Sequence, residues 1–467
     1  MTDLSTKSSG DTGPGKALSA KGWLDYRTIW RWHFYAGLFC VPFIVALAIS
    51  GALYLFKPQV EAFIDRPYDH LVLTGPAADA NAQALAALAA VPDGTLRTYI
   101  LPEEADDAVR VLVRDGQGAV WRVYVHPQSL EVLHKIREED RLMQQIKKFH
   151  GELLLGDNGS LFVELAACWG IVMVVSGLYL WWPRGQQGWA GVLYPRLTAG
   201  GRTFWRDLHA VVGLWVSFLA LFLLLTGLPW ASVWGEAFKT VRKATGTAAV
   251  QQDWTTSRRA ERAGHDAHDH AEADGMHHAG LSMDDMMVGA VSLTEVVARV
   301  TPLNLAAPVL INLPASVGGN WAVRSMTANR PNRVAIDLDG STGTMVRRED
   351  FGDRHVIDRV VGIGIAAHEG QLFGWVNQAL GVVAALGLVL LSVSGAVMWW
   401  KRRPAGALGA PPPLRLKGSP AVMGMILLGF ALFLPLLGAS VILVALIDLV
   451  ILRQVPVARR WLGLRLA

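Results

Sequence analysis

Five long apolar runs dominate the pattern of this chain, and none of them contains Asp, Glu, Lys or Arg. They cover residues 34–56, 165–182, 210–234, 376–400 and 421–447. A helix rises 1.5 Å per residue, so about 20 apolar residues cross the hydrocarbon core of a bilayer. The pattern therefore predicts five membrane crossings. The polar residues 1–24 are predicted to be a disordered cytoplasmic tail and not a cleavable signal.

Composition supports a membrane protein and narrows its chemistry. Charged residues make up 18% of the chain, against about 25% in soluble proteins. The only two cysteines, Cys40 and Cys168, lie inside apolar runs. A disulfide framework, a zinc ribbon and a CxxCH haem-attachment motif are therefore excluded, and any cofactor must be held without cysteine. The net charge of +4 is small for this length, and nothing supports binding of nucleic acid.

Basic residues next to the apolar runs predict the orientation. Arg27 and Arg31 precede the first run, Arg184 and Arg206 lie between the second and third, and Lys401 follows the fourth. The positive-inside rule makes these segments cytoplasmic. The two long segments between the other runs are then external, which means periplasmic in a bacterium with two membranes.

The last apolar run does not obey this rule. A single crossing leaves the basic residues 453–467 outside, and Pro435 interrupts the run at its middle. We favour one crossing kinked at Pro435, and a re-entrant hairpin is the alternative.

The chain contains an internal repeat. WRWHFYAGL around His33 resembles WRDLHAVVGL around His209, 176 positions later, and the segment around His150 resembles that around His368, 218 positions later. Each half therefore has the order helix, external domain, histidine segment, helix. Because each half crosses the membrane twice, the halves run in the same direction and are related by an axis along the membrane normal.

The predicted fold class is an α-helical polytopic membrane protein with a four-helix core, built as two parallel repeats, one C-terminal helix and two small external α+β domains. In the first domain, residues 81–90 have a helical pattern and 96–101, 108–113 and 119–125 have strand patterns. In the second, 293–300 are helical and 309–313, 321–326 and 333–338 are strands.

The expected boundaries along the whole chain are a tail at 1–24, a first crossing at 25–57, external domain 1 at 58–140, a histidine segment and second crossing at 141–183, a cytoplasmic loop at 184–204, a third crossing at 205–234, external domain 2 at 235–355 with an insertion at 262–287, a histidine segment and fourth crossing at 356–401, a cytoplasmic loop at 402–419, a fifth crossing at 420–452 and a basic tail at 453–467.

Four histidines beside the crossings are candidate ligands. A histidine in or beside a membrane span is costly unless it has a partner. His33 and His209 share the cytoplasmic level, and His150 and His368 share the external level. A parallel repeat brings equivalent residues face to face, so we expect two imidazole pairs. Each pair suits one b-type haem, which gives two haems at opposite faces of the membrane.

Four glycines lie at the same two levels. Gly51 and Gly227 lie 18 residues after His33 and His209, roughly 27 Å along the helix. Each glycine follows a Ser or Thr, and we hypothesise that it lets a porphyrin approach the backbone, Gly51 and Gly227 at the outer haem, Gly177 and Gly395 at the inner one. Ordinary packing of small residues between helices is the alternative.

Other arginines and histidines are weaker candidates for a functional role. Arg31 and Arg206 flank the inner histidine pair, where they could neutralise haem propionates or anchor the helices. His70, His126, His134 and His355 have no repeat partner and are predicted to be surface residues.

The insertion at 262–287 is rich in histidine and methionine. Imidazole binds copper and zinc, and thioether selects Cu(I). The insertion is therefore a candidate copper or zinc site, and a solvated low-complexity linker is the alternative. The candidate ligands are His265, His268, His270, His277, His278, Met276, Met283 and Met286.

Five segments of the chain carry a resemblance to a known family: RWHFYAGLF, HGELLLGDNG, SGLYLWWPR and the domain ends near VYVHPQSLEVL and AIDLDGSTGTMV. Through these segments the chain resembles the PepSY-associated transmembrane family over about residues 25–405. This family includes iron-regulated inner-membrane ferric-siderophore reductases with two haems. The resemblance implies reduction of ferric-siderophore, or other metal, complexes in the periplasm. His33, His150, His209 and His368 match the family's histidine positions, and the resemblance implies that they are the haem ligands.

The expected function is therefore a haem-dependent metalloreductase of the bacterial inner membrane. No nucleotide-binding fingerprint is present, because Gly362-Ile363-Gly364 is too short, so the electrons must come from a separate reductase or a membrane quinol. Two other classes remain open. One is a non-redox membrane protein whose external domains bind a metal, siderophore or peptide, and the other is a permease with a histidine proton relay.

Overall fold

The computed structural model describes residues 26–184, 188–247, 291–314, 318–411 and 420–464. Within this part of the chain, five helices are long and apolar enough to cross a membrane. The prediction of a polytopic helical membrane protein is thus confirmed at this level. The five are α1 (Tyr26–Tyr54), α5 (Gly156–Trp181), α6 (Gly201–Gly227), which continues as a 3-10 turn at Leu228–Trp230, α11 (Trp375–Arg402) and the segment Pro435–Gln454, which consists of α13 (Pro435–Val450) and the 3-10 turn at Leu452–Gln454.

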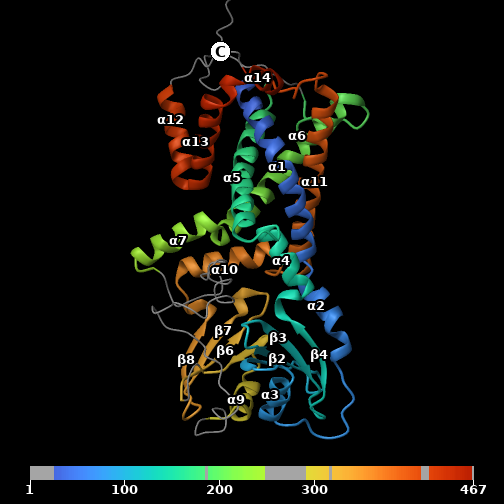
Figure 1. Cartoon of the computed structure of the whole chain (residues 1–467). Coiled ribbons are helices and arrows are strands. Elements are labelled where there is room, and N and C mark those ends of the chain that lie inside the picture. The colour runs from blue at the N-terminus through green and yellow to red at the C-terminus, as the bar shows by residue number, and fades with distance from the viewer. Residues whose placement is uncertain (1–25, 185–187, 248–290, 315–317, 412–419, 465–467) are drawn as a thin grey trace, which may run out of the picture.

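Four of these helices form a closed set of contacts. α1 packs against α5 and α11, and α6 packs against the same two helices (Figure 1). Small residues permit the closest approaches. A Cβ atom added at Gly387 of α11 would lie 2.3 Å from Cγ2 of Val216 of α6, so only glycine allows this contact. Close packing at small residues is a main source of helix association in lipid.

The last apolar run is a helical hairpin. α12 (Pro420–Phe433) ends before Pro435, which opens α13. Proline lacks the N–H needed to continue α12 but fits the first turn of a new helix. α12 and α13 pack against each other (Figure 1), and a Cβ atom at Gly438 would lie 2.5 Å from Cβ of Ala431.

The hairpin returns the C-terminal segment to the N-terminal end of α1. In α14 (Pro456–Leu462) the carbonyl of Trp461 accepts a hydrogen bond of 2.9 Å from the N–H of Leu408, just after α11. The expected single kinked crossing at 420–452 is therefore wrong, because the chain turns back at Pro435. The basic residues after α13 lie with the other basic segments, as the positive-inside rule requires.

Beyond the helical bundle, the described residues form one antiparallel sheet of eight strands in the order β4-β3-β2-β1-β5-β6-β7-β8. The expectation of two separate external domains is corrected by the pairing of β1 with β5, which runs from Thr98 opposite Asn312 to Leu101 opposite Val309. An edge strand exposes unpaired N–H and C=O groups, and this pairing satisfies both edges at once. The strands are β1 (Thr95–Leu101), β2 (Val109–Arg114), β3 (Val120–Val125), β4 (Val132–Arg137), β5 (Val309–Asn312), β6 (Trp321–Ser325), β7 (Val334–Leu338) and β8 (Met345–Asp350).

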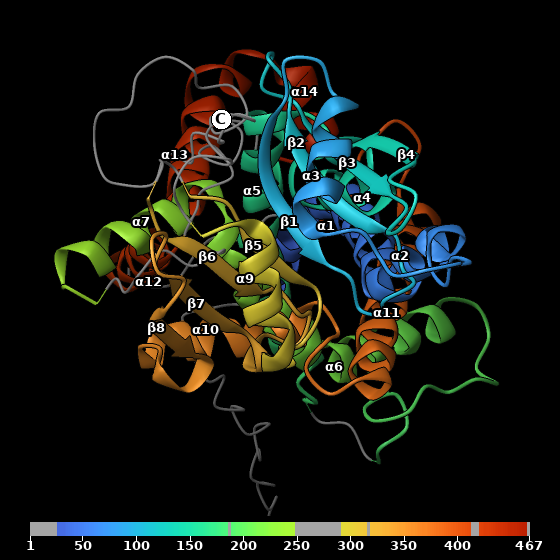
Figure 2. The same ribbon diagram turned by 90° about the horizontal axis from the view of Figure 1, so that it is seen from below.

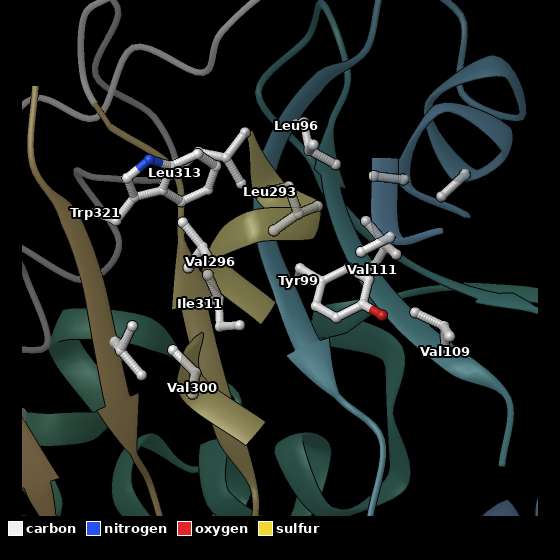
Figure 3. Packing of buried hydrophobic residues seen from close by; sticks show 14 of the residues in the cluster. Leu96, Tyr99, Val109, Val111, Leu293, Val296, Val300, Ile311, Leu313 and Trp321 are labelled. Carbon is white, nitrogen blue, oxygen red and sulfur yellow. The ribbon is translucent and has the colours of Figure 1, made fainter. Parts of the chain in front are cut away.

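Two helices, α3 (Ala80–Ala89) and α9 (Leu293–Val300), cover one face of this sheet side by side (Figure 2). Their apolar residues and alternate strand residues form one core that spans both halves of the sheet. Figure 3 shows Val296 and Val300 of α9 against Ile311 of β5, with Tyr99 of β1 beside them. The shared core binds the two sequence halves into one external unit.

The six strands expected from the sequence lie where the pattern placed them, within one or two residues. β4 and β8 had no expected counterpart. They are the two edges of the sheet, and β8 (MVRRED) is largely exposed and charged. Charged edge strands protect a sheet from further pairing. Because charged residues replace apolar ones in such strands, the alternation of apolar and polar residues that predicts a strand is missing.

Four shorter helices connect the sheet to the crossings: α2 (Lys57–Asp65), α4 (Leu142–Glu152), α7 (Ser232–Ala244) and α10 (Val356–His368). α7 and α10 lie across the end of the helical bundle (Figure 1). A buried ion pair joins them, in which Arg242 donates to Asp358 at 2.8 and 2.9 Å.

Replacing Asp358 with alanine is expected to lower the free energy of unfolding by about 3 kcal/mol, because it leaves the Arg242 charge buried without this carboxylate. Thermal unfolding in detergent measures the effect. Lys239→Ala is the control, since its pair with Glu236 is at the surface and should change stability by less than about 0.5 kcal/mol. Equal melting temperatures for D358A and K239A would show that the buried pair does not hold α7 to α10.

Candidate functional site

The structure brings the four histidines together as two pairs. His33 of α1 and His209 of α6 have ring centres 6.4 Å apart, with their planes at 88°. His150 of α4 and His368 of α10 have ring centres 6.5 Å apart, with their planes at 81°. Each pair joins one residue from each sequence half. The first pair lies near the start of α1 and α6, and the second lies between the bundle and the sheet.

The spacing in each pair fits two imidazoles that share one metal atom. A metal–imidazole nitrogen bond is about 2 Å long, and the nitrogen lies about 1.2 Å from the centre of its ring, so two rings on opposite sides of one iron would have centres roughly 6.3 Å apart. The observed separations are 6.4 and 6.5 Å. Axial ligation of a haem by two histidines is consistent with both pairs.

Each histidine is held through Nδ1 by a Ser or Thr on a neighbouring helix. These hydroxyls come from the Ser/Thr-Gly dipeptides, and the four contacts repeat the same scheme in each half. The contacts are His33 with Ser176 at 2.9 Å, His150 with Ser50 at 3.0 Å, His209 with Ser394 at 3.0 Å and His368 with Thr226 at 2.8 Å.

A backbone carbonyl determines which ring nitrogen of His209 carries the proton. The Nδ1 of His209 lies 3.1 Å from the carbonyl oxygen of Leu391. A carbonyl can only accept, so Nδ1 is the N–H donor in this ring. Nε2 of His209 keeps its lone pair and is the nitrogen available to a metal.

The Ser and Thr residues are functional candidates that the sequence reasoning did not identify. The hydroxyl of Thr226 donates to the carbonyl of Phe222 at 2.7 Å, and that of Ser50 donates to the carbonyl of Ala46 at 2.8 Å. A hydroxyl that donates to a carbonyl still accepts from Nδ1–H. The Ser/Thr-Gly dipeptide at a matched offset from each histidine was the available signal, but only the glycine had been given a role.

The glycines lie against the imidazole rings at the expected levels. A Cβ atom would be 3.1 Å from Cε1 of His150 at Gly51 and 3.2 Å from Cε1 of His33 at Gly177. The corresponding distances are 3.4 Å at Gly395, beside His209, and 3.8 Å at Gly227, beside His368. The contact that the structure shows is therefore with the edge of the imidazole. The hypothesis that these glycines face a porphyrin stays a prediction.

Desolvation favours a metal-binding form of His368 in the outer pair. His368 ends α10, outside the crossings, and burial lowers its pKa to about 4. This imidazole is therefore neutral at physiological pH. A neutral ring is the form that coordinates a metal.

The two inner arginines have structural partners. Arg31 donates to the carbonyl oxygens of Pro411 at 2.6 Å and Gly463 at 2.9 Å, which ties α1 to the C-terminal segment. Arg206 pairs with the buried Asp207 at 2.7 Å. These contacts support the anchoring role considered for Arg31 and Arg206 and give no support to a role in binding propionates.

The histidines without repeat partners lie outside both pairs. His134 of β4 stacks on Tyr68, with ring centres 5.4 Å apart. His126 and His355 accept backbone N–H bonds in a turn and at the start of α10. The insertion at 262–287, with all its candidate copper or zinc ligands, lies outside the described residues, so its metal role stays a prediction.

Comparison with known proteins places most of the chain in one family region. Residues 30–402 match the PepSY-associated TM region. The match begins three residues before His33 and ends with α11, so it includes all four histidines and the whole sheet. The α12–α13 hairpin lies beyond it. No curated protein matches the chain closely enough to count as a relative.

Proposed function

Because this chain belongs to the PepSY-associated TM family, a family of multi-pass membrane proteins, we propose that it is a two-haem transmembrane reductase. It would take electrons from the cytoplasmic side or the quinone pool and deliver them to a ferric-siderophore complex, or a cupric complex, in the periplasm. The protein would lie in a bacterial inner membrane with its large loops and sheet in the periplasm.

The observation that carries this proposal is the two facing histidine pairs at opposite levels of the bundle. Gly51, which touches His150, lies 18 residues after His33 in the same helix α1, or roughly 27 Å along its axis. A histidine pair at each end of four apolar helices is what an electron path across a bilayer requires. When bound, the two b-type haems supply one-electron transfer.

The protein's own residues would bind and orient these groups. His33 with His209 and His150 with His368 supply the Nε2 ligands, and the Ser/Thr hydroxyls hold each ring in one orientation. Outer contacts of this kind fix the tautomer and raise the basicity of the ligand. The apolar side chains of the surrounding helices exclude water.

The proposed direction of electron flow rests on the family resemblance, and the proposed orientation on the positive-inside rule. The positive-inside rule puts the basic ends of α1, α6 and α11 in the cytoplasm, so the outer pair and the sheet face the periplasm. The donor would be a separate reductase or a quinol. The siderophore substrate rests on the family resemblance alone.

The absorbance spectrum of the purified protein, expressed with an ample haem supply, tests the proposal. We expect reduced b-type bands and two haems per chain. A colourless protein would contradict the proposal and favour a non-redox protein that binds metal, siderophore or peptide, or a histidine-relay permease.

Electron paramagnetic resonance gives a sharper test of the geometry. Both pairs have nearly perpendicular imidazole planes, at 88° and 81°, and the splitting of the iron d orbitals depends on this angle. We expect the ferric protein to give highly anisotropic low-spin signals. A rhombic signal, which parallel planes produce, would contradict the ring orientations described above.

A further inference from the structure

α7 lies across the sheet end of the helical bundle, directly after α6 (Figure 1). Its 13 residues are too few to cross a bilayer, which needs about 20. A carboxylate of α5 holds its first turn, because Glu164 accepts the N–H groups of Val233 at 2.7 Å and Trp234 at 3.0 Å. Glu164 immediately precedes the charge-free run 165–182 of α5. α7 therefore starts at the level where the lipid-compatible part of the bundle begins.

The side chains of α7 separate into an apolar face and a charged face. Trp234, Phe238 and Val241 recur every three or four residues and so share one face of the helix. The rings of Trp234 and Phe238 stack with their centres 5.1 Å apart, and Val241 is 61% exposed. The charged residues outside the ion pair with α10 share the opposite face, and they are Glu236, Lys239 and Lys243.

Contacts with two other elements show how these faces are oriented. Nε1 of Trp234 donates to the carbonyl of Phe433 at 2.9 Å, and Phe433 is the last residue of α12, at the turn of the apolar hairpin. The apolar face of α7 therefore lies on the side from which the hairpin approaches. Arg242 pairs with Asp358 of α10 on another side of the helix. The charged face is then turned away from the hairpin.

We propose that α7 is an interfacial helix whose apolar face is immersed in the bilayer, at the boundary between headgroups and acyl chains. Aromatic residues on one face and lysines on the other are typical of helices that lie in this plane, and Trp is favoured at this depth. The ion pair of Arg242 links α7 to α10, whose last residue is His368. An immersed α7 would thus hold the outer histidine pair at a fixed distance from the lipid surface.

Nitroxide labels on single introduced cysteines test this placement in the full chain, reconstituted in phosphatidylcholine bilayers. The substitutions are Val241→Cys on the apolar face, Lys243→Cys on the charged face and Val346→Cys on β8. Val346 is the matched control, because this valine is 59% exposed on the edge of the sheet. The native Cys40 and Cys168 are buried, and the wild-type chain treated with the label gives the background. The accessibility of each label to oxygen, which concentrates in lipid, is compared with its accessibility to a nickel chelate, which stays in water.

We expect the label at position 241 to lie about 5–10 Å below the headgroups, with more access to oxygen than to nickel. The labels at positions 243 and 346 should be reached mainly by nickel. Equal access of nickel to positions 241 and 346 would overturn the immersion. A label at position 241 screened from both reagents would show that protein covers this face, and the assignment to lipid would be wrong.

Equal immersion of positions 241 and 243 would contradict the orientation of the two faces. None of these results requires bound haem. A colourless protein would therefore refute the proposed reductase and leave the interfacial placement of α7 open to the same measurement.

Discussion

We expect His150→Ala to leave the purified protein with one of the two proposed haems. The ring of His150 faces His368 at 6.5 Å, and a single remaining imidazole cannot hold a b-type haem by two axial bonds. Because electrons would have to pass both levels to cross the bilayer, reduction of an external ferric complex in vesicles should fall to background. Haem and protein assays on the same sample measure the stoichiometry.

His33→Ala should remove the inner haem by the same argument, and the haem left behind should differ from that in H150A in its spectrum and potential. His134→Ala is the control, since this histidine stacks on Tyr68 in the sheet and should leave both haems in place. Two haems per chain with an unaltered spectrum in both H33A and H150A would eliminate these residues as ligands.

Replacing Gly51 with leucine will remove the outer haem as completely as the loss of His150. A Cβ atom at this position is only 3.1 Å from Cε1 of His150, and the remaining atoms of leucine need space that the ring occupies. The imidazole must therefore leave the position in which it faces His368. Haem content and the spectrum of the remaining inner haem measure the effect.

Alanine at two equivalent glycines provides an internal comparison. Gly51→Ala forces a close contact, at a cost of about 1–3 kcal/mol, whereas Gly227→Ala makes an ordinary contact of 3.8 Å with His368. We expect haem to dissociate roughly tenfold faster from G51A than from G227A, since about 1.4 kcal/mol corresponds to a factor of ten. Equal dissociation rates would mean that these glycines do not position the imidazoles.

Much of the architecture could be predicted because the apolar length of a run is enough to identify a membrane-spanning helix. A charge-free run of about 20 residues has few alternatives to a spanning helix. The repeat then gave the expected pairs, since equivalent residues of a parallel repeat meet across its axis. This relation predicts the pairs His33 with His209 and His150 with His368, which the structure brings face to face.

Other features could not be predicted because they depend on contacts between distant segments. The hydroxyl of Ser176 is a ligand-orienting group only because α5 brings it to Nδ1 of His33. β1 pairs with β5 because the edges of the two half-sheets meet. The residues of β1 and β5 do not by themselves show that each strand will pair with the other.

The sequence by itself determined the first four apolar helices, the duplicated plan and the four histidines, because hydrophobic length and repeat spacing are local properties of a chain. Only the tertiary structure decided that the last run turns back at Pro435, that two half-sheets close into one and that each imidazole is held through Nδ1 by a hydroxyl of a neighbouring helix. These outcomes depend on which surfaces meet, and side chains hundreds of positions apart supply the hydrogen bonds and close contacts that select them.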